Sequence, residues 1–115
     1  MSNKWVGLVS VLLAKTQEGS LSWQETSDED TFVVVVGSNA VEVEQGGFGD
    51  EFEFRIRDGN GRIVDKFNDV ELTNISGNDY SDQLQQMFVL IKRQLSGTEK
   101  VLDDIISGLT GRIKF

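Results

Sequence analysis

The strongest constraint on the fold is a row of five strand-like segments in the middle of the chain. They occur at residues 21–26, 31–36, 41–44, 51–57 and 62–67. Most of them alternate apolar with polar residues, and the second contains four consecutive valines, which is typical of a central strand. One helical pattern precedes the row and two follow it, an order that indicates an α+β fold. We therefore expect a two-layer structure, an antiparallel meander of about five strands with an N-terminal helix and two C-terminal helices packed on one face.

Three segments carry apolar residues at helical spacing. In residues 3–18 the apolar stripe includes Trp5, Val9 and Leu13, and Gly19 follows as a C-terminal cap. Residues 80–95 form a longer stripe, which predicts the clearest helix of the chain. Residues 101–109 form a further apolar stripe, so we expect a last helix that ends near Gly108 or Gly111.

The last two strands predict a hairpin with a defined register. Gly59-Asn60 fits a two-residue type II′ turn in which Gly59 takes the positive φ, so Arg57 should face Arg62. The same register places Asp65 opposite Phe54 on the inward face, which a carboxylate does not favour. Either a β-bulge shifts the register, or Asp65 is a charged residue that protects an exposed sheet edge from pairing with another strand.

The size and composition of the chain indicate one soluble domain. The 115 residues are 38% hydrophobic and 26% charged, which is far from the composition of a disordered chain. A chain of this length buries about two thirds of its extended surface in a single core. We expect a domain over residues 1–111 and a short tail at 112–115. There is no window apolar enough to span a bilayer and no cleavage-site pattern, so we expect a cytoplasmic protein.

Charge and missing residue types exclude several functions. The sequence has no histidine and no cysteine, which removes the commonest general base, the thiol nucleophile and the usual zinc ligands. The formal net charge is −8 at pH 7, which opposes binding to nucleic acids or to anionic membranes. We therefore expect no nucleic-acid partner, no membrane partner, no cofactor and no metal.

Carboxylate pairs are the remaining route to acid–base chemistry. The pairs considered are Asp65 with Asp69 and Glu42 with Glu44. Catalytic carboxylates need burial to separate their pKa values, so we expect these side chains to face solvent on strands or loops. A carboxylate-dependent, metal-assisted enzyme stays open as an alternative function.

Two glycine-rich segments resemble ligand-binding loops only in part. Residues 58–61, Asp-Gly-Asn-Gly, match the start of a calcium loop, but Arg62 stands at position five and Asp69 at position twelve. Residues 46–49, Gly-Gly-Phe-Gly, lack the lysine and the following helix of a phosphate-binding loop. We interpret the first segment as a hairpin turn and the second as a connection between strands.

The candidate contact surface is the open face of the sheet or the edge of its first strand. Trp5 and Trp23 fall on apolar stripes, so both are expected to be core anchors unless they prove exposed. The residues that we assign to this candidate interface are Leu21, Trp23, Glu42, Glu44, Phe48, Glu53 and Arg55.

Part of the sequence also resembles known proteins. The stretch from Leu12 to Trp23 includes Lys15-Thr16, Gly19, Leu21 and Trp23, with the spacing Lys-Thr-x-x-Gly-x-Leu-x-Trp. This pattern resembles a group of small uncharacterised bacterial proteins, as do residues 92–94 and 101–106. The resemblance implies a helix, a hairpin sheet and two closing helices. That group has no assigned activity, so it implies no catalytic residue.

These observations favour a non-enzymatic protein, because compactness and acidic charge suit recognition better than chemistry. The sequence predicts a small bacterial binding or adaptor module with a protein partner, and a homodimer is one of the assemblies left open. The alternatives are a secretion chaperone, an immunity-type inhibitor, or the metal-assisted enzyme named above.

Overall fold

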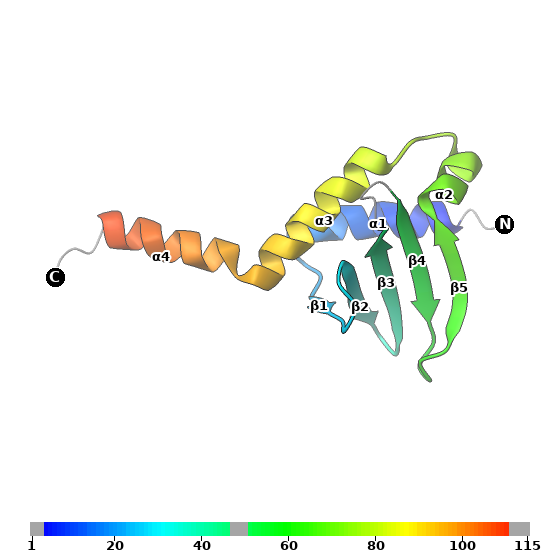
Figure 1. Ribbon diagram of the computed structural model, residues 1–115, viewed down its shortest axis with the longest axis horizontal. Helices are drawn as coiled ribbons and strands as arrows, with labels where there is room; N and C mark the ends of the chain where they lie inside the picture. Colours follow the sequence, from blue (N-terminus) through cyan, green and yellow to red (C-terminus); the bar gives the residue numbers. More distant parts are fainter. Residues whose placement is uncertain (1–3, 47–50, 111–115) are drawn as a thin grey trace.

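The computed structural model describes residues 4–46 and 51–110, and for Glu99 only the backbone (Figure 1). The elements in chain order are α1 (Lys4–Glu18), β1 (Trp23–Glu25), β2 (Thr31–Val36), β3 (Asn39–Gln45), β4 (Phe52–Arg57), β5 (Ile63–Asn68), α2 (Asp69–Ser76), α3 (Ser81–Ser96) and α4 (Thr98–Thr110). The strands form one sheet in the order β1-β2-β3-β4-β5, and every neighbouring pair is antiparallel. The expected α+β fold with an antiparallel meander is confirmed.

Alternation along the strands divides the sheet into an inner and an outer face. On β3, Val41 and Val43 are buried, whereas Glu42 and Glu44 lie on the other side. α1 crosses behind the strands, and α3 runs obliquely beside α1. These two helices therefore cover the inner face of the sheet (Figure 1). The core is closed by Phe88 of α3, whose ring makes edge-to-face contacts with Phe32 and Phe52.

Both tryptophans attach α1 to the sheet, one near each end of the helix. Trp5 stacks on Phe67 with ring centroids 4.5 Å apart, and Phe67 stacks on Phe54 at 4.9 Å. Near the other end, the indole Nε1 of buried Trp23 donates to Thr16 Oγ1 at 3.1 Å. The helix is therefore held against β5 near its start and against β1 near its end.

A short helix, α2, follows β5 and was not expected. Asn68 caps it: its side chain accepts the backbone N–H of Glu71, and the Glu71 side chain accepts the N–H of Asn68. The next residue, Asp69, is buried and its Oδ1 accepts the Phe52 N–H at 3.3 Å. The expectation that Asp69 faces solvent is wrong, because its carboxylate binds the first residue of β4.

The predicted turn and register of the last hairpin are also wrong. Gly61, and not Gly59, has a positive φ of 83°, and five residues join β4 to β5. The pairing shifts at a bulge beside Ile56 and Arg57, so that Phe54 faces Phe67 and Asp65 faces Ile56. The bulge is one of the two explanations offered for Asp65. It places two phenylalanines opposite each other on the inner face and leaves Asp65 exposed on the edge strand β5.

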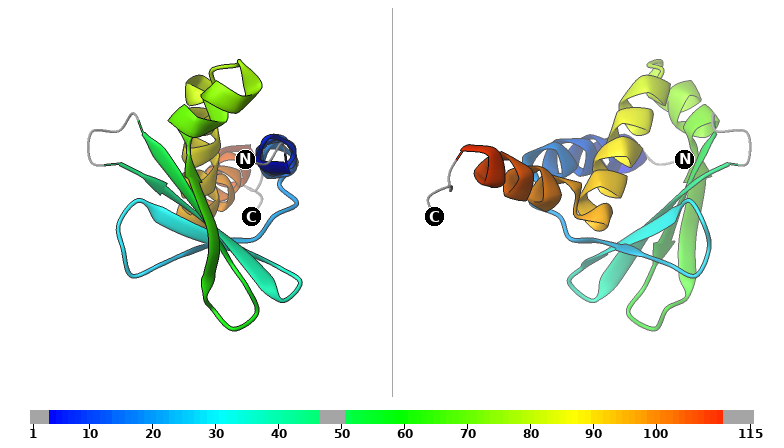
Figure 2. Two further views of the ribbon diagram at one scale, coloured as in Figure 1. Left: turned by 90° about the vertical axis from the view of Figure 1, so that its right-hand side faces the viewer. Right: turned by 60° about the vertical axis from the view of Figure 1, so that its left-hand side comes forward.

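The last helix, α4, leaves the body of the protein (Figure 2). α3 ends at Gly97, whose φ of 70° caps the helix, and the chain continues in a new direction. The radius of gyration is 16.8 Å, compared with about 13 Å for a compact chain of this length. Of the two C-terminal helices, only α3 packs on the sheet; the inner face is already occupied by α1 and α3.

Candidate functional site

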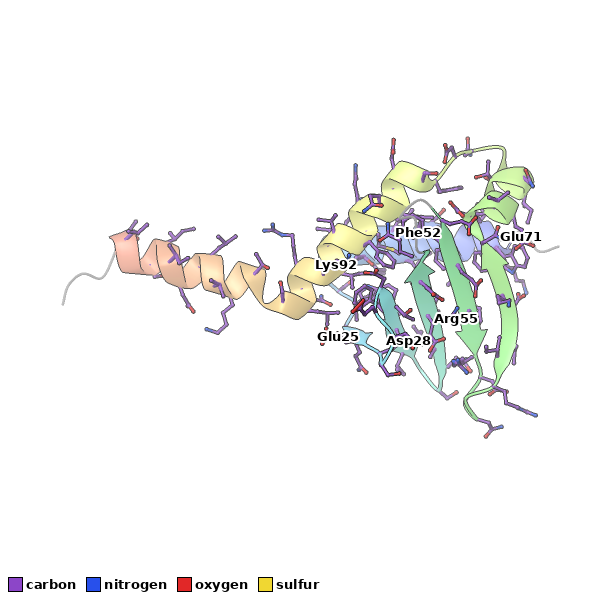
Figure 3. All side chains as sticks on the ribbon, viewed as in Figure 1. Glu25, Asp28, Phe52, Arg55, Glu71 and Lys92 are labelled. Carbon is purple, nitrogen blue, oxygen red and sulfur yellow. The ribbon has the colours of Figure 1, made fainter. Side chains whose placement is uncertain are left out.

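Four of the residues predicted for the interface come together on the outer face of the sheet: Glu42, Glu44, Glu53 and Arg55. Figure 3 labels Arg55 on β4. Arg55 Nε lies 3.1 Å from Glu42 Oε1, and its Nη1 lies 2.8 Å from Glu44 Oε1 and 2.7 Å from Glu53 Oε2. Arg57 adds a second cation, with its Nε 3.2 Å from Glu42. The register explains the cluster, because Glu42 faces Arg55 and Glu44 faces Glu53 across neighbouring strands.

Within the cluster, the charges of the two arginines offset most of the charge of the three glutamates. Burial lowers the pKa of Arg55, but the hydrogen bonds to Glu44, Glu42 and Glu53 outweigh that effect and raise the pKa well above its ordinary value. Arg55 therefore stays protonated and holds the opposed Glu44 and Glu53 together. An arrangement in which each cation already has carboxylate partners stabilises the sheet and leaves little charge for a ligand.

The other predicted interface residues lie elsewhere. Trp23 is only 3% exposed and its backbone N–H donates to Gln94 Oε1 of α3, so it is withdrawn from the interface as a core residue. The Gln94 amide also donates to the Leu21 carbonyl, which blocks part of the β1 edge. Phe48 and most of the glycine-rich segment at 46–49 lie outside the described residues.

Leu21 lines an apolar groove between α1 and the end of the β2–β3 hairpin. The groove has a volume of about 390 Å³. Its apolar lining comprises Leu8, Val11, Leu12, Leu21, Val36 and Val41. Val11 and Val36 are 55% and 53% exposed, so the groove presents aliphatic surface to solvent. Clustered apolar surface of this kind marks contact sites more often than isolated exposed residues do.

A second apolar surface lies on α4. Five aliphatic side chains repeat along one face of this helix and are 40–78% exposed: Val101, Leu102, Ile105, Ile106 and Leu109. The side chains of α4 extend freely from the ribbon in Figure 3. We call this surface the α4 stripe. The spacing of these residues in the sequence predicts a helix with one apolar face to bury. We expected the sheet to cover this face, whereas the structure leaves it exposed.

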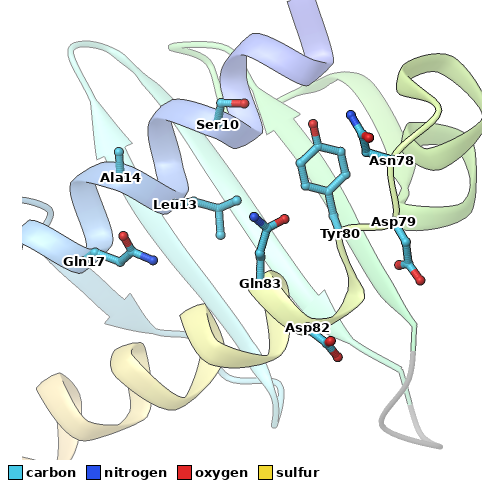
Figure 4. A pocket seen from close by; sticks show the side chains of 9 residues that line it. All are labelled: Ser10, Leu13, Ala14, Gln17, Asn78, Asp79, Tyr80, Asp82 and Gln83. Carbon is cyan, nitrogen blue, oxygen red and sulfur yellow. The ribbon is translucent and has the colours of Figure 1, made fainter.

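A polar depression of about 690 Å³ lies between α1 and the start of α3 (Figure 4). Its carboxylates are Asp79 and Asp82, and Tyr80 forms part of the wall. Asp79 Oδ1 accepts hydrogen bonds from the Ser81 hydroxyl at 2.6 Å and from the Ser81 N–H at 2.9 Å. These two bonds lower the pKa of Asp79. The carboxylate thus binds the first residue of α3, which is a structural role.

The carboxylate pairs considered for catalysis do not act as pairs. Asp65 accepts from Trp5 and Asp69 from Phe52, while Glu42 and Glu44 share Arg55. The Asp58 carboxylate accepts the N–H groups of Asn60 and Arg62, so it closes the β4–β5 turn. Within residues 4–46 and 51–110, no group of three carboxylates is arranged to hold a metal ion.

Two further findings concern the chain as a whole. Across the described ranges, every helix is too short or too polar to cross a lipid bilayer. No family model, curated protein or solved structure matches this chain. By its fold and its exposed surfaces, this protein is an α+β domain that carries an apolar groove and a projecting amphipathic helix.

Proposed function

We propose that this chain is a cytoplasmic, non-enzymatic protein-binding module whose binding element is α4. The observation that carries the proposal is the α4 stripe, which remains exposed on a helix that extends from an otherwise well-packed domain. Exposed aliphatic side chains at this spacing are typical of a helix that lies in an apolar groove of a partner. Burying each of them stabilises a complex by about 1.5–3 kcal/mol at most.

The polar side of α4 favours a protein over a membrane or a nucleic acid. Asp103 and Asp104 lie on the side of the helix away from the stripe, and the Asp104 carboxylate is 3.1 Å from Lys100 Nζ. Membrane-surface helices carry lysines and arginines on their polar face, as do helices that contact phosphates. The net charge of −8 opposes both kinds of partner over the whole molecule.

Site-specific photo-crosslinking tests this proposal. A photoreactive phenylalanine analogue replaces Ile105 on the stripe or, as the matched control, Asp103 on the other side of the same helix. After irradiation in a bacterial lysate, we expect a crosslinked protein from position 105 and little from position 103. Equal yields from both positions, or no crosslink from either, would contradict the proposal.

A further inference from the structure

We infer that the partner of the α4 stripe is a second copy of this chain, and that two copies exchange α4 reciprocally. Each α4 lies in the other copy's apolar groove between α1 and the β2–β3 hairpin. This inference rests on the proposed function and names the partner of the same site. It predicts a dimer with two-fold symmetry, the commonest form of homo-oligomer.

The chain carries both halves of a helix-in-groove contact. α4 is about 20 Å long at 1.5 Å per residue, and its apolar residues recur every three or four positions. The groove offers aliphatic side chains from α1 and from β2, with Val11 and Val36 about half exposed. Each surface is apolar and the described residues leave each of them open to solvent.

The direction of α4 keeps its stripe away from the groove of its own chain. The helix points away from the sheet and from α1, and the molecule measures 61 Å along its longest axis against 32 and 25 Å across (Figure 2). In this arrangement α4 does not cover the groove of its own chain. A projecting arm of this kind is suited to the exchange of identical elements between two copies.

A stable dimer must bury a minimum area of surface between its two copies. A free aliphatic side chain exposes on the order of 100 Å², and the stripe residues are 40–78% exposed. One stripe therefore presents roughly 300 Å² of apolar surface, and its burial against a partner surface of equal area removes roughly 600 Å² in total. Specific interfaces bury about 1,200–2,000 Å². One contact does not reach this range, whereas two symmetric contacts do, so the area favours reciprocal exchange over a one-way contact or a pairing of two α4 helices.

Local charge is compatible with this arrangement although the total charge opposes it. Lys15 stands among the groove residues, 51% exposed and 3.8 Å from Glu18. α4 carries Asp103 and Asp104 on the polar side of the helix, away from the centre of its stripe. With the stripe in the groove these carboxylates face solvent, so docking buries no charge of α4.

Sedimentation equilibrium of the purified full chain tests the dimer. Ile105→Asp changes the stripe and Val11→Asp changes the groove, and neither side chain is in the core. Val70→Asp on α2 is the matched control, since Val70 and Val11 are both 55% exposed. Each change occurs twice in a symmetric dimer, so we expect the dissociation constant to rise about a hundredfold for the first two variants and to stay unchanged for the control. A wild-type monomer at all concentrations would overturn the inference.

Introduced cysteines show which surfaces of the two copies meet in the dimer, because the chain has no cysteine of its own that would crosslink. Val11→Cys is combined by mixing with Leu102→Cys, Ile105→Cys or Leu109→Cys in a separate chain, and the mixture is oxidised. We expect at least one mixture to give a covalent dimer that neither single variant forms alone. Dimers from an α4 variant alone would show α4–α4 pairing and overturn the inference.

Both positions are then changed in one chain, as Val11→Cys with Ile105→Cys. A disulfide within a monomer would show that α4 folds back on its own groove, which also overturns the inference. A monomeric protein that still crosslinks another protein from position 105 would overturn the self-partner alone and leave the proposed function standing. The absence of any crosslink would remove both.

Discussion

The indole Nε1 of Trp5 donates a hydrogen bond of 2.7 Å to Oδ2 of Asp65. This contact joins the first turn of α1 to the edge strand β5, beside the stacked rings of Trp5 and Phe67. It gives a function to a carboxylate that the predicted register placed against Phe54. The bulge moves Asp65 out of the aromatic stack and into reach of the indole N–H.

Removing this bond should lower the free energy of unfolding modestly. Asp65→Ala is expected to cost about 1 kcal/mol, the net value of one hydrogen bond, because the contact is exposed to solvent. Trp5→Phe keeps a stacked ring but loses the N–H donor. In urea denaturation the double variant should cost less than the sum of the two singles. Additive costs would show that the two groups are not coupled, and Asp103→Ala on α4 controls for the loss of a carboxylate.

The bond between Trp23 and Thr16 is buried, so its loss should cost more. Thr16→Val keeps the shape of the side chain but leaves the indole N–H without an acceptor, which is expected to destabilise the protein by about 1–3 kcal/mol. Thr16→Ser keeps the hydroxyl and should cost less. Chemical denaturation of the two variants measures the difference. If the valine variant is as stable as the serine variant, the indole has found another acceptor.

The Arg55 cluster predicts a change of sign between two backgrounds. In the wild type, Glu44→Gln removes an ion pair with Arg55 and should destabilise the sheet by up to about 1 kcal/mol. In an Arg55→Gln background, Glu44 directly faces Glu53 without the bridging cation. There the same Glu44→Gln change should stabilise the protein, because it relieves repulsion between opposed like charges. A destabilising effect in both backgrounds would contradict this account.

The same cluster has a defined pH dependence. The folded state raises the pKa of Arg55 above its unfolded value, so its stabilising effect is fully present below the unfolded pKa and is lost only as pH rises through the folded value. The cost of Arg55→Gln should therefore stay constant between pH 7 and about pH 10. Urea denaturation across this range measures it.

The contact of Asp79 with Ser81, the first residue of α3, predicts a measurable shift in the pKa of Asp79. Its pKa is lowered by the Ser81 hydroxyl first and by the Ser81 N–H second. Ser81→Ala should raise the pKa of Asp79 toward its ordinary value, and Ser81→Thr should leave it low. Because the folded-state pKa is lowered, the contribution to stability exists above the unfolded pKa and is lost as pH falls through the folded value. Carboxyl NMR titration of the three proteins measures the shift, and an unchanged pKa in the alanine variant would contradict the assignment.

The strands could be predicted from the sequence because their pattern is local. The run of β-branched residues predicted the bounds of β2 correctly, and period-two alternation predicted that Glu42, Glu44, Glu53 and Arg55 share one face. The β4–β5 turn could not be predicted in the same way. Asp58 accepts two backbone N–H groups and so stabilises a five-residue loop, a competition that the Gly59-Asn60 pattern does not show.

The helices show a different limit. The capping box of Asn68 and Glu71 is visible in the sequence and would have indicated α2, but that helix has only two buried residues and a weak apolar pattern. α4, in contrast, has a strong apolar pattern, so the sequence predicts the helix and the face that it must bury. The pattern does not identify the surface that covers this face, which can be the sheet or a second molecule.

The charge of the chain gives a last test of the exchanged dimer. Two copies with a formal charge of −8 each repel one another, and this repulsion opposes association at low ionic strength. Burial of the α4 stripe is apolar and is not weakened by salt screening. Raising NaCl to about 0.5 M reduces the Debye length to a few ångströms, so the dimer should become tighter, as measured by sedimentation equilibrium. Weaker association in salt would mean that ion pairs, and not the α4 stripe, hold the copies together.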